Sequence, residues 1–501
     1  MSLAKMALVF LAAHAATALL FLLDRAPGTG AALVGLPLDD AWIHMVYARS
    51  LAALHGFAYN PGQLETGSTS PLWAVLLVPA SWTARLFGIT AAIPAKVTGV
   101  LFAAGASLGA ARLMRTLKFG LAVELAAGFA IAADPALAFA QVSGMEVMVA
   151  AALVLWTLAD LAAGRYRMAS LWAGLAPLAR PELAILTVLS LGVAEWRMHQ
   201  ERASVRARLS ILLPAAAFVG GWVIFCLWVS GYPLPSTYYA KFASRQDYFA
   251  SNLMLIFTQI VPSWPCFARG TGFVLWGVGV VVLFRLGLVA CLGALFPVLF
   301  LLAAAASQLI KEPWPFYWQR YLLPAHGILL LTLVVGAEAV IRWAWRTRQR
   351  ASAPAFAIVA AVLVLGALFD LPVALRRSAD LYAWNCQNIE EMNVAMARWL
   401  RDHTPANETI AVTDAGAARY FSDRRIIDLV GLNDHRTLHH DLERQREASS
   451  VRILCTFPAW MPALRDNPAW QVIHRTATDH LTICNCPQSE IVAYQRRDSV
   501  P

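Results

Sequence analysis

The chain has 501 residues, of which 59% are hydrophobic and only 14% are charged, and its formal net charge is +9. Soluble globular proteins usually carry about 25% charged residues, so this composition excludes an ordinary water-soluble protein. The positive charge would suit nucleic-acid binding, but the Arg residues form short clusters between apolar runs, as in the cytoplasmic loops of polytopic membrane proteins. The sequence therefore predicts an integral membrane protein that is embedded in a lipid bilayer and binds no nucleic acid.

Apolar runs of roughly 18–22 residues are long enough to cross a bilayer as α-helices. The first such run covers 6–23, and a cleaved signal peptide is the alternative interpretation of it. A stretch at 168–195 is interrupted by Arg180, Pro181 and Glu182, and because Pro breaks a straight helix we expect two short helices there. The other expected spans are 93–114, 121–133, 147–161, 209–230, 272–284, 286–309, 322–341 and 355–371. Together these runs predict a polytopic α-helical membrane protein with about eleven transmembrane helices.

The basic clusters fall on alternate loops between the expected spans, which indicates the side of the membrane on which each loop lies. The clusters are Lys5, 112–118, 165–167, 197–208, Arg285 and 342–350. Since basic loops stay in the cytoplasm, we expect a cytoplasmic amino terminus in a bacterial inner membrane. By parity, the carboxyl-terminal segment is expected to be extracytoplasmic. We therefore divide the chain into a transmembrane domain, 1–375, and an extracytoplasmic domain, 376–501.

The segment 376–501 returns to the composition of a soluble protein and predicts a small α/β domain. Apolar residues at helical spacing predict a helix over 388–402. Runs of β-forming residues predict strands at 409–413, 425–430, 451–457, 470–475 and 480–484. Four of the seven Cys residues lie in this segment, namely Cys386, Cys455, Cys484 and Cys486. An exported domain sits in an oxidising space, so a disulfide is an option, whereas zinc is disfavoured because no second Cys/His pair at finger spacing accompanies Cys484 and Cys486.

The first outer loop contains two adjacent carboxylates, Asp39 and Asp40, directly after an apolar run, and we expect interfacial helices over 39–90. Ionisable groups at the membrane are costly unless they face an aqueous cavity. If the segment is helical, His44 lies four residues after Asp40 and shares its face. One of the two carboxylates could then act as a general base that takes a proton from an acceptor hydroxyl. The alternative is that both residues only cap the helix.

Other outer loops carry groups that suit a phosphate-bearing substrate. Glu146 is a second carboxylate at the end of an expected span, whereas Lys241 and Arg320 are cations among aromatic residues such as Tyr321. Charge pairing can hold a phosphate while the rings pack against the rest of the ligand. The alternative is an aromatic belt with Lys and Arg side chains that reach toward the interface.

Several sequence blocks occur in the order found in one superfamily of membrane enzymes. The blocks are Asp39-Asp40, 57–62, 65–73, 143–146, 179–182, 233–241, 320–324, 414–417 and 428–434. Their order resembles the GT-C superfamily of integral membrane glycosyltransferases, and in particular the arabinofuranosyltransferase-B type. Residues 66–70 are small and polar where that type tends to carry an acidic and aromatic segment, which leaves the sugar and the acceptor open.

The resemblance implies a GT-C fold and a polyprenyl-phosphate-linked sugar as the donor. It also implies that an acidic residue of the first outer loop is the catalytic base, carried onto Asp40 or Asp39. We favour Asp40, because it shares a helical face with His44. A single displacement would invert the anomeric carbon of a sugar such as a pentofuranose, and the acceptor would be a glycan, a glycolipid or a protein. The candidate substrate-binding residues are His44, Tyr59, Asn60, Glu65, Glu146, Arg180, Glu182, Lys241, Arg320, Tyr321 and Asp414.

No cofactor is firmly implied, and a divalent metal stays an open option. A transporter or flippase of lipid-linked envelope precursors is the main alternative function, since it would share the spans and the membrane-embedded charges. Against it, the chain shows no repeated half. The small-residue turn that begins at Asp414 is further expected to pack near the membrane cavity and help bind the acceptor, with a plain structural turn as the alternative.

Overall fold

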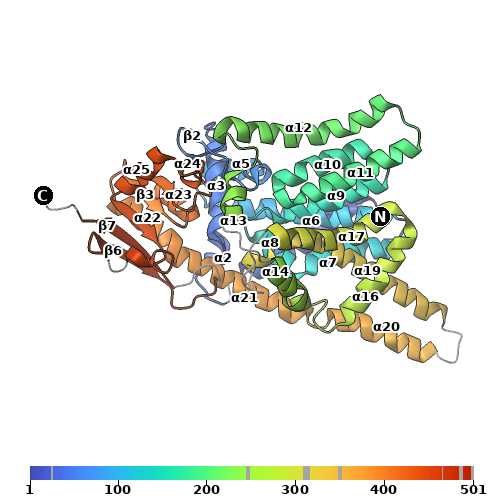
Figure 1. Ribbon diagram of the computed structural model, residues 1–501. Helices are drawn as coiled ribbons and strands as arrows, with labels where there is room; N and C mark the ends of the chain where they lie inside the picture. The colour runs from blue at the N-terminus through green and yellow to red at the C-terminus, as the bar shows by residue number, and fades with distance from the viewer. Residues whose placement is uncertain are drawn as a thin grey trace.

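The computed structural model describes residues 1–23, 26–243, 249–307, 316–347, 353–464, 467–483 and 489–497. A bundle of helices forms one end of the molecule and a smaller domain with a β-sheet forms the other end (Figure 1). Short helices that follow the first bundle helix lie between these two parts. The arrangement agrees with the expected helical membrane protein that carries an α/β domain.

Each of the eleven expected spans coincides with a helix of the bundle. Within the described chain, six helices are long and apolar enough to cross a membrane, or seven if the bent pair α7 and α8 forms one span. The bundle helices are α1 (Leu3–Leu22), α6 (Ala92–Thr116), α7 (Leu121–Ala133), α8 (Pro135–Val142), α9 (Val147–Ala162), α10 (Tyr166–Ala179), α11 (Ala184–Gln200), α12 (Val205–Ser230), α16 (Thr271–Leu286), α17 (Leu288–Ser307), α19 (Leu323–Arg346) and α20 (Ala353–Leu368).

The break that Pro181 predicts is present. Helix α10 ends at Ala179, and the single 3₁₀ turn η1 (Pro181–Leu183) connects it to α11. Arg180 at the junction has extended backbone, because the residue before a proline is disfavoured in helical geometry. The two short helices are therefore confirmed, and the junction brings Arg180 and Glu182 to the end of the bundle that faces the sheet domain.

The first outer loop folds into short elements. They are α2 (Ala31–Val34), α3 (Asp39–Ala52), the hairpin of β1 (Ala58–Asn60) and β2 (Gln63–Leu64), α4 (Pro71–Leu76) and α5 (Val78–Phe87). Helix α3 begins at the acidic pair, as expected. Its Trp42 is buried, with ring centroids 4.9 Å from Tyr420 and 4.6 Å from Phe421 of the sheet domain. The apolar side of α3 therefore faces protein.

The sheet domain contains five strands in the order β4-β3-β5-β7-β6. The strands are β3 (Thr409–Val412), β4 (Arg425–Asp428), β5 (Ile453–Thr456), β6 (Trp470–Ala477) and β7 (Glu490–Arg496). β3, β4 and β5 are parallel, whereas β7 runs antiparallel to both β5 and β6. The helices are α22 (Ala395–His403), α23 (Gly416–Ser422), α24 (His435–Leu438) and α25 (Leu442–Ser450). The predicted α/β domain is confirmed.

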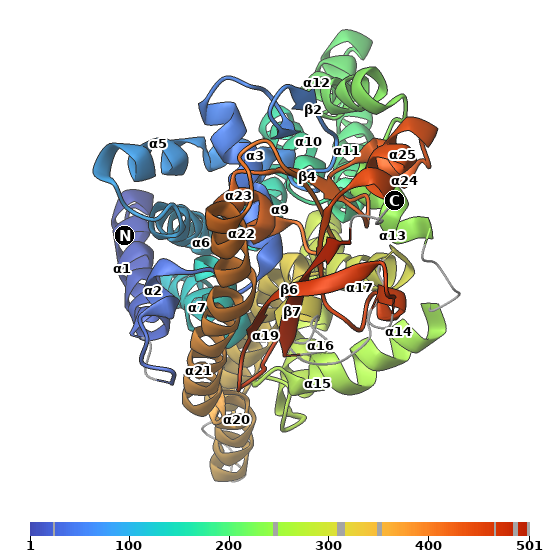
Figure 2. The same ribbon diagram turned by 90° about the vertical axis from the view of Figure 1, so that its left-hand side faces the viewer.

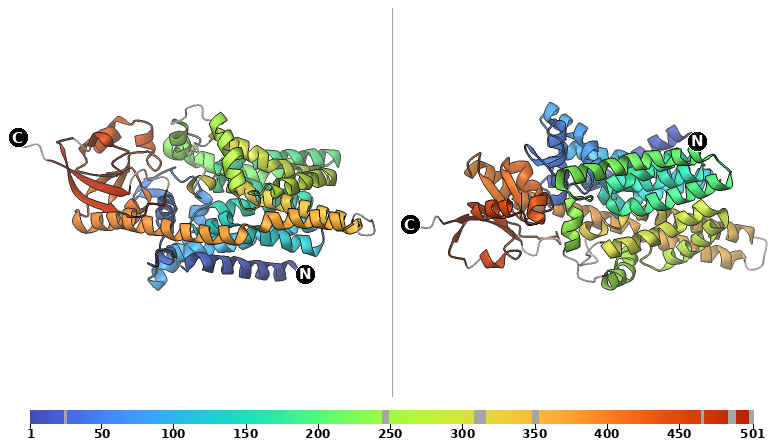
Figure 3. Two further views of the ribbon diagram at one scale, coloured as in Figure 1. Left: turned by 90° about the horizontal axis from the view of Figure 1, so that it is seen from below. Right: turned by 45° about the horizontal axis from the view of Figure 1, so that its top comes forward.

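One long helical segment connects the two parts of the molecule. After α20, helix α21 (Leu371–Ile389) continues through the π-helical turn η3 (Glu390–Val394) into α22. It runs along the side of the molecule from the bundle to the sheet (Figure 3, left). The helix expected at 388–402 is the end of this longer helical segment. The expected division of the chain at 375 falls inside α21 and stays a prediction.

The strand expected at 480–484 is wrong for residues 480–483. There, the side chain of Asn388 forms the hydrogen bonds that a neighbouring strand would form with the backbone. Its Nδ2 donates to the His480 carbonyl at 2.8 Å, and its Oδ1 accepts from the Thr482 N–H at 2.7 Å. The last strand is instead β7, which the sequence analysis missed. Cys386 and Cys455 carry free thiols, and Cys484 and Cys486 lie outside the described residues.

Candidate active site

A cavity of about 280 Å³ lies where the bundle, the first outer loop and the sheet domain meet. Its walls come from α3, the loop before α4, the residues before α9, the α10–α11 junction, α13 (Ser236–Ala243), the segment before α19 and the loop after β4. The polar and aromatic residues that line it are Asp40, His44, Thr69, Ser70, Glu146, Arg180, Glu182, Thr237, Tyr238, Arg320, Tyr321 and Asn433. Six of the predicted site residues are therefore brought together with Asp40.

Asp40 stands at this cavity in an ion pair with Arg320, between the carboxylate Oδ2 and the guanidinium Nη2. The Asp40 side chain is 28% exposed and that of Arg320 only 3%. Arg320 also donates to the hydroxyl of Tyr321 at 3.1 Å. Asp40 therefore combines contact with a buried cation, which favours its ionised form, with the access to the cavity that a base acting on a bound substrate needs.

A second charged cluster lies one helical turn further along α3. His44 Nε2 is 3.3 Å from Glu146 Oε2, and the other carboxylate oxygen of Glu146 pairs with Arg180 Nη1. Arg180 Nε is also 3.5 Å from Glu182 Oε2. The sequence analysis linked His44 to Asp40, and both residues line the cavity, but the His44 ring contacts Glu146 instead. His44 therefore belongs to the Glu146–Arg180 cluster.

The two buried guanidinium groups lie against one aromatic ring. The Cζ atom of Arg180 is 5.0 Å from the ring centroid of Tyr321, and that of Arg320 is 5.1 Å from it. Cation–π attraction adds to the ion pairs and holds both groups beside the cavity. A phosphate would meet two cations here, which is the chemistry that favours charge-assisted hydrogen bonds.

Asp39 lies outside the cavity lining and points to the sheet domain. It accepts hydrogen bonds from the N–H groups of Gly416 (2.6 Å) and Ala417 (2.8 Å), at the start of α23. Figure 2 shows α23 beside α3. Burial raises the pKa of Asp39, and burial together with the adjacent Asp39 raises the pKa of Asp414 well above its usual value. The two buried carboxyl groups therefore lie close enough for each to influence the pKa of the other.

Two residues of the hairpin bind the sheet domain and do not line the cavity. The Tyr59 hydroxyl donates to the Ala415 carbonyl at 2.5 Å. The Asn60 side chain donates to the Ile426 carbonyl at 2.8 Å and accepts from the Ile426 N–H at 3.0 Å. In this way Asn60 pairs with the edge strand β4 much as a neighbouring strand would. Tyr59 and Asn60 therefore dock the hairpin on the sheet domain, and their expected role in substrate binding stays a prediction.

Glu65, which follows the hairpin, also contributes to the interface between the first outer loop and the sheet domain. Its Oε2 accepts from His435 Nδ1 at 2.7 Å and from the His435 N–H at 3.2 Å. The hydrogen bond to Glu65 raises the pKa of His435, and burial raises the pKa of Glu65. Although the sequence analysis placed Glu65 among the substrate-binding residues, its carboxylate is used by His435 because the loop is folded onto α24.

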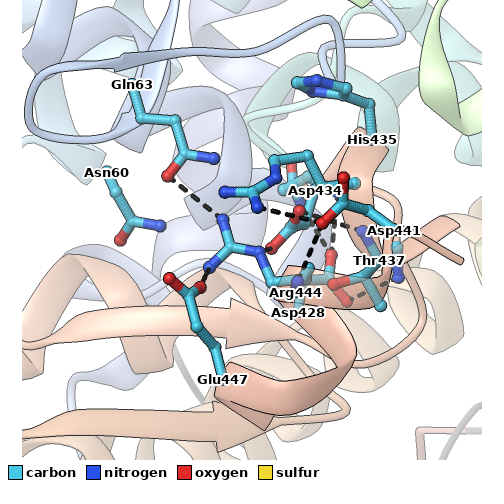
Figure 4. Close-up of polar contacts among 12 residues, drawn as sticks. Asn60, Gln63, Asp428, Asp434, His435, Thr437, Asp441, Arg444 and Glu447 are labelled. Atoms are coloured by element: carbon cyan, nitrogen blue, oxygen red, sulfur yellow. Dashed lines mark hydrogen bonds and ion pairs between the residues drawn. The ribbon is translucent and has the colours of Figure 1, made fainter. Parts of the chain in front are cut away.

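A buried arginine extends the same interface (Figure 4). Arg444 Nη2 donates to Gln63 Oε1 of the hairpin at 3.3 Å, while Nε and Nη1 pair with Asp434 at 3.0 Å and Glu447 at 2.6 Å. Its side chain is 1% exposed. An Arg that is fully desolvated between charged partners is costly to disturb, so Asp434 and Glu447 of the sheet domain hold Arg444 in place for its contact with Gln63 of the hairpin.

The loop after β4 brings the sheet domain to the cavity. Asp428 Oδ2 accepts from the Asn433 N–H at 2.9 Å, and the Tyr47 hydroxyl donates to Asn433 Oδ1 at 3.2 Å. A methyl group on Gly67 would overlap the Leu432 carbonyl oxygen, so only glycine allows this approach. Asn433 was missed as a site residue, although the block 428–434 pointed to its loop. The turn at Asp414 docks on Asp39, beside Asp40 of the cavity, and its expected role in acceptor binding stays a prediction.

One family model, described as a domain of unknown function (DUF8728), matches residues 385–498. A comparison of the sequence with curated proteins gives no significant match. The structure is similar to ArnT from Cupriavidus metallidurans, both in the apo state (14% identity, TM-score 0.57) and bound to undecaprenyl phosphate (12%, 0.58), with 98% of each chain covered in both comparisons.

Two further solved structures share the architecture. The archaeal oligosaccharyltransferase AglB from Archaeoglobus fulgidus, in complex with an inhibitory peptide and a dolichol-phosphate, is 12% identical with a TM-score of 0.56. That match covers 89% of this chain and 69% of AglB. The arabinofuranosyltransferase AftD from Mycobacteria is 17% identical with a TM-score of 0.52, over 99% of this chain and 40% of AftD.

The protein has the GT-C fold. The expected fold class, a multi-pass helical membrane protein with an α/β domain, is thereby confirmed. In this GT-C fold, the cavity lies between the bundle and the sheet domain.

Lys241 and a divalent metal were two further candidates for the site. The side chain of Lys241 lies outside the described residues, and the neighbouring α13 residues Thr237 and Tyr238 line the cavity. Among the described residues, no group of three or more His, Cys, Asp or Glu side chains is arranged to hold a metal ion.

Proposed function

We propose that this protein is a membrane glycosyltransferase that moves a sugar from a polyprenyl-phosphate carrier to an acceptor hydroxyl. The observation that carries the proposal is the pairing of Asp40 with Arg320 at the cavity, with the second cation Arg180 against the same Tyr321 ring. The likeness to ArnT with undecaprenyl phosphate and to AglB with a dolichol-phosphate supports a lipid-linked donor.

In the proposed reaction Asp40 takes the proton of the acceptor hydroxyl as its oxygen attacks the anomeric carbon. The bond between that carbon and the phosphate oxygen breaks, and the bond electrons leave with the phosphate on its lipid. Arg320 and Arg180 balance the negative charge of the phosphate. Glu146 and Glu182, which also line the cavity, are the carboxylates that we assign to stabilising the positive charge that develops on the sugar ring. Attack from the side opposite to the leaving phosphate inverts the anomeric carbon.

The cavity volume and the similar structures narrow the substrate class. At about 280 Å³ the cavity is slightly smaller than the roughly 300–1,000 Å³ that is typical of small-molecule sites, which suits the transfer of a single sugar. The likeness to an arabinofuranosyltransferase makes a pentofuranose our proposed sugar. The proposed acceptor is a glycan, a glycolipid or a protein, and its hydroxyl is the group that must reach Asp40.

The experiment that tests this function uses membranes containing the protein and a radiolabelled polyprenyl-phosphate pentofuranose. The label is expected to leave the lipid and appear on an acceptor, in amounts that increase with the amount of protein. Movement of labelled lipid across the membrane without transfer would instead support a transporter or flippase.

Loss of one cavity cation is expected to weaken use of the donor. Arg320→Ala should raise the KM for the donor about 10–100-fold, because a hydrogen bond to a charged group contributes roughly 1.5–3 kcal/mol. Arg269→Ala is the matched control, since Arg269 is an exposed Arg paired with Asp370 outside the cavity lining. Steady-state rates at varied donor concentration measure both variants. A normal KM in Arg320→Ala would reject a role in phosphate binding, and Lys241→Ala would test the other proposed cation.

We also propose that the amino terminus is cytoplasmic and that the sheet domain lies outside the cytoplasm of a bacterium, attached to its inner membrane. The basis is the alternation of basic loops along the chain. A phosphatase that folds only in the periplasm, fused after Pro501, is expected to be active. A cytoplasmic reporter at the same place should be inactive, and the opposite pair of results would reverse the topology.

A further inference from the structure

Asp39 and Asp40 are adjacent in sequence but belong to different parts of the structure. Asp40 lines the cavity, whereas Asp39 lies against the first residues of α23 in the sheet domain. Neighbouring residues on an α-helix project roughly 100° apart around its axis. Because both residues stand in the first turn of α3, the direction in which Asp39 is held also determines where the Asp40 carboxylate points.

The contact between Asp39 and α23 is unusually close. Asp39 is buried and uses both carboxylate oxygens to accept the N–H groups of Gly416 and Ala417. A methyl group on Gly416 would overlap both the backbone carbonyl oxygen of Asp39 and its carboxylate. Glycine is therefore required at position 416 for α23 and the start of α3 to approach each other this closely.

Other contacts attach α3 and the strand β1 after it to the same region of the sheet domain. Tyr59, which follows α3, donates to the Ala415 carbonyl, and its own carbonyl accepts from Arg419 Nε at 3.0 Å. The ring of Trp42, three residues after Asp39, packs on Phe421. Residues 415–421 are thus attached to both the beginning of α3 and the strand that follows it, and this attachment uses residues outside the cavity lining.

We infer that Asp39 is a positioning residue: its contact with Gly416 and Ala417 couples the sheet domain to the direction of Asp40 in the cavity. This inference rests on the proposed function, in which Asp40 is the base. The sheet domain then has a role in the reaction beyond the cavity wall that Leu432 and Asn433 provide. Since Asp39 lies outside the cavity lining, its effect is expected on the rate of the chemical step and not on donor binding.

The coupling should depend on pH in a defined direction. Asp414 faces Asp39, Asp40 and the Cys455 thiol, Tyr59 faces Asp39, and Asn393 donates to Asp414 at 2.7 Å. Because burial and Asp39 raise the pKa of Asp414, the contribution of protonated Asp414 to the contact is lost as pH rises through that raised pKa. Asp414→Asn keeps a donor at this position and should preserve the contact at high pH.

The test compares Gly416→Ala with Gly105→Ala in the full-length protein reconstituted in lipid nanodiscs. Gly105 lies in helix α6, and an added methyl there meets open space, so this variant controls for the substitution itself. Hydrogen exchange of a peptide over 413–422 reports whether the N–H groups of Gly416 and Ala417 remain bonded. Turnover is measured with the radiolabelled polyprenyl-phosphate pentofuranose at several donor concentrations.

In Gly416→Ala we expect faster exchange over 413–422 and a kcat lower on the order of 10²-fold, the effect of about 1 Å of misplacement, with an unchanged KM for the donor. Asp39→Asn should likewise lower kcat without changing the KM for the donor, and Asp414→Asn should keep its kcat to a higher pH than the wild type does. Faster exchange with a wild-type kcat would overturn the inference while leaving the proposed function intact, and so would equal losses in the two glycine variants. Failure of the wild type to transfer label would reject the proposed function, and the exchange data would still test the contact.

Discussion

Asp40→Asn is expected to lower turnover by roughly 10²–10⁴-fold, the usual contribution of a general base. The amide cannot take the acceptor proton, but it keeps nearly the same shape and can still accept a hydrogen bond from Arg320. Donor binding and thermal stability should therefore change little. Single-turnover rates with bound donor measure the chemical step directly.

The comparison variant is Asp402→Asn, which removes an exposed carboxylate of α22 that pairs with Arg401 outside the cavity lining. It is expected to turn over at the wild-type rate. If Asp40→Asn also kept that rate, the assignment of the base would be wrong, and Glu146 would be the next carboxylate to test. Loss of expression without a change in rate would instead indicate that Asp40 only caps α3.

Arg180→Met is expected to destabilise the fold by about 3–5 kcal/mol, because it leaves Glu146 as a buried charge without its main partner. The Arg180 and Glu146 side chains are only 5% and 4% exposed. Thermal unfolding of the purified protein measures the loss. The exposed pair of Arg398 and Glu390 provides the comparison, and Arg398→Met should cost less than about 1 kcal/mol.

The double variant Arg180→Met/Glu146→Gln shows how much of the stability lost in Arg180→Met comes from the unpaired charge of Glu146 and how much comes from lost packing. Removing both partners of a buried ion pair is often close to neutral, so the double variant should recover part of the stability lost in Arg180→Met, while Glu182 lacks Arg180 in both variants. Equal stability of the single and double variants would show that Glu146 does not depend on Arg180, and the cluster proposed around His44 would be wrong.

The membrane fold could be predicted from the sequence because it depends on local properties. Apolar length identifies the helices, and Pro181 marks the break between α10 and α11. The helix at Asp39 and the β-runs of the sheet domain also follow from nearby residues. The prediction of a strand at 480–483 failed because Asn388, far away in sequence, supplies the hydrogen bonds that a neighbouring strand would supply.

The roles of the individual site residues needed the tertiary structure. In sequence, Asp39 and Asp40 are two equal carboxylates, and the helical face shared with His44 favoured Asp40. The partner that distinguishes them, Gly416, is 377 residues from Asp39. Tyr59 and Asn60 occur in blocks typical of the superfamily, but their contacts with the sheet domain come from long-range packing. Local spacing cannot separate residues that build a cavity from residues that hold a domain against it.

The most direct test of the central claim is a single-turnover experiment with purified protein, radiolabelled polyprenyl-phosphate pentofuranose and an acceptor fraction from the native envelope. Our account predicts that each labelled sugar transferred to the acceptor releases one polyprenyl phosphate, and that Asp40→Asn binds the same donor but transfers it roughly 10²–10⁴-fold more slowly. Transfer at equal rates by the wild type and Asp40→Asn, or donor consumption without any labelled acceptor, would contradict it.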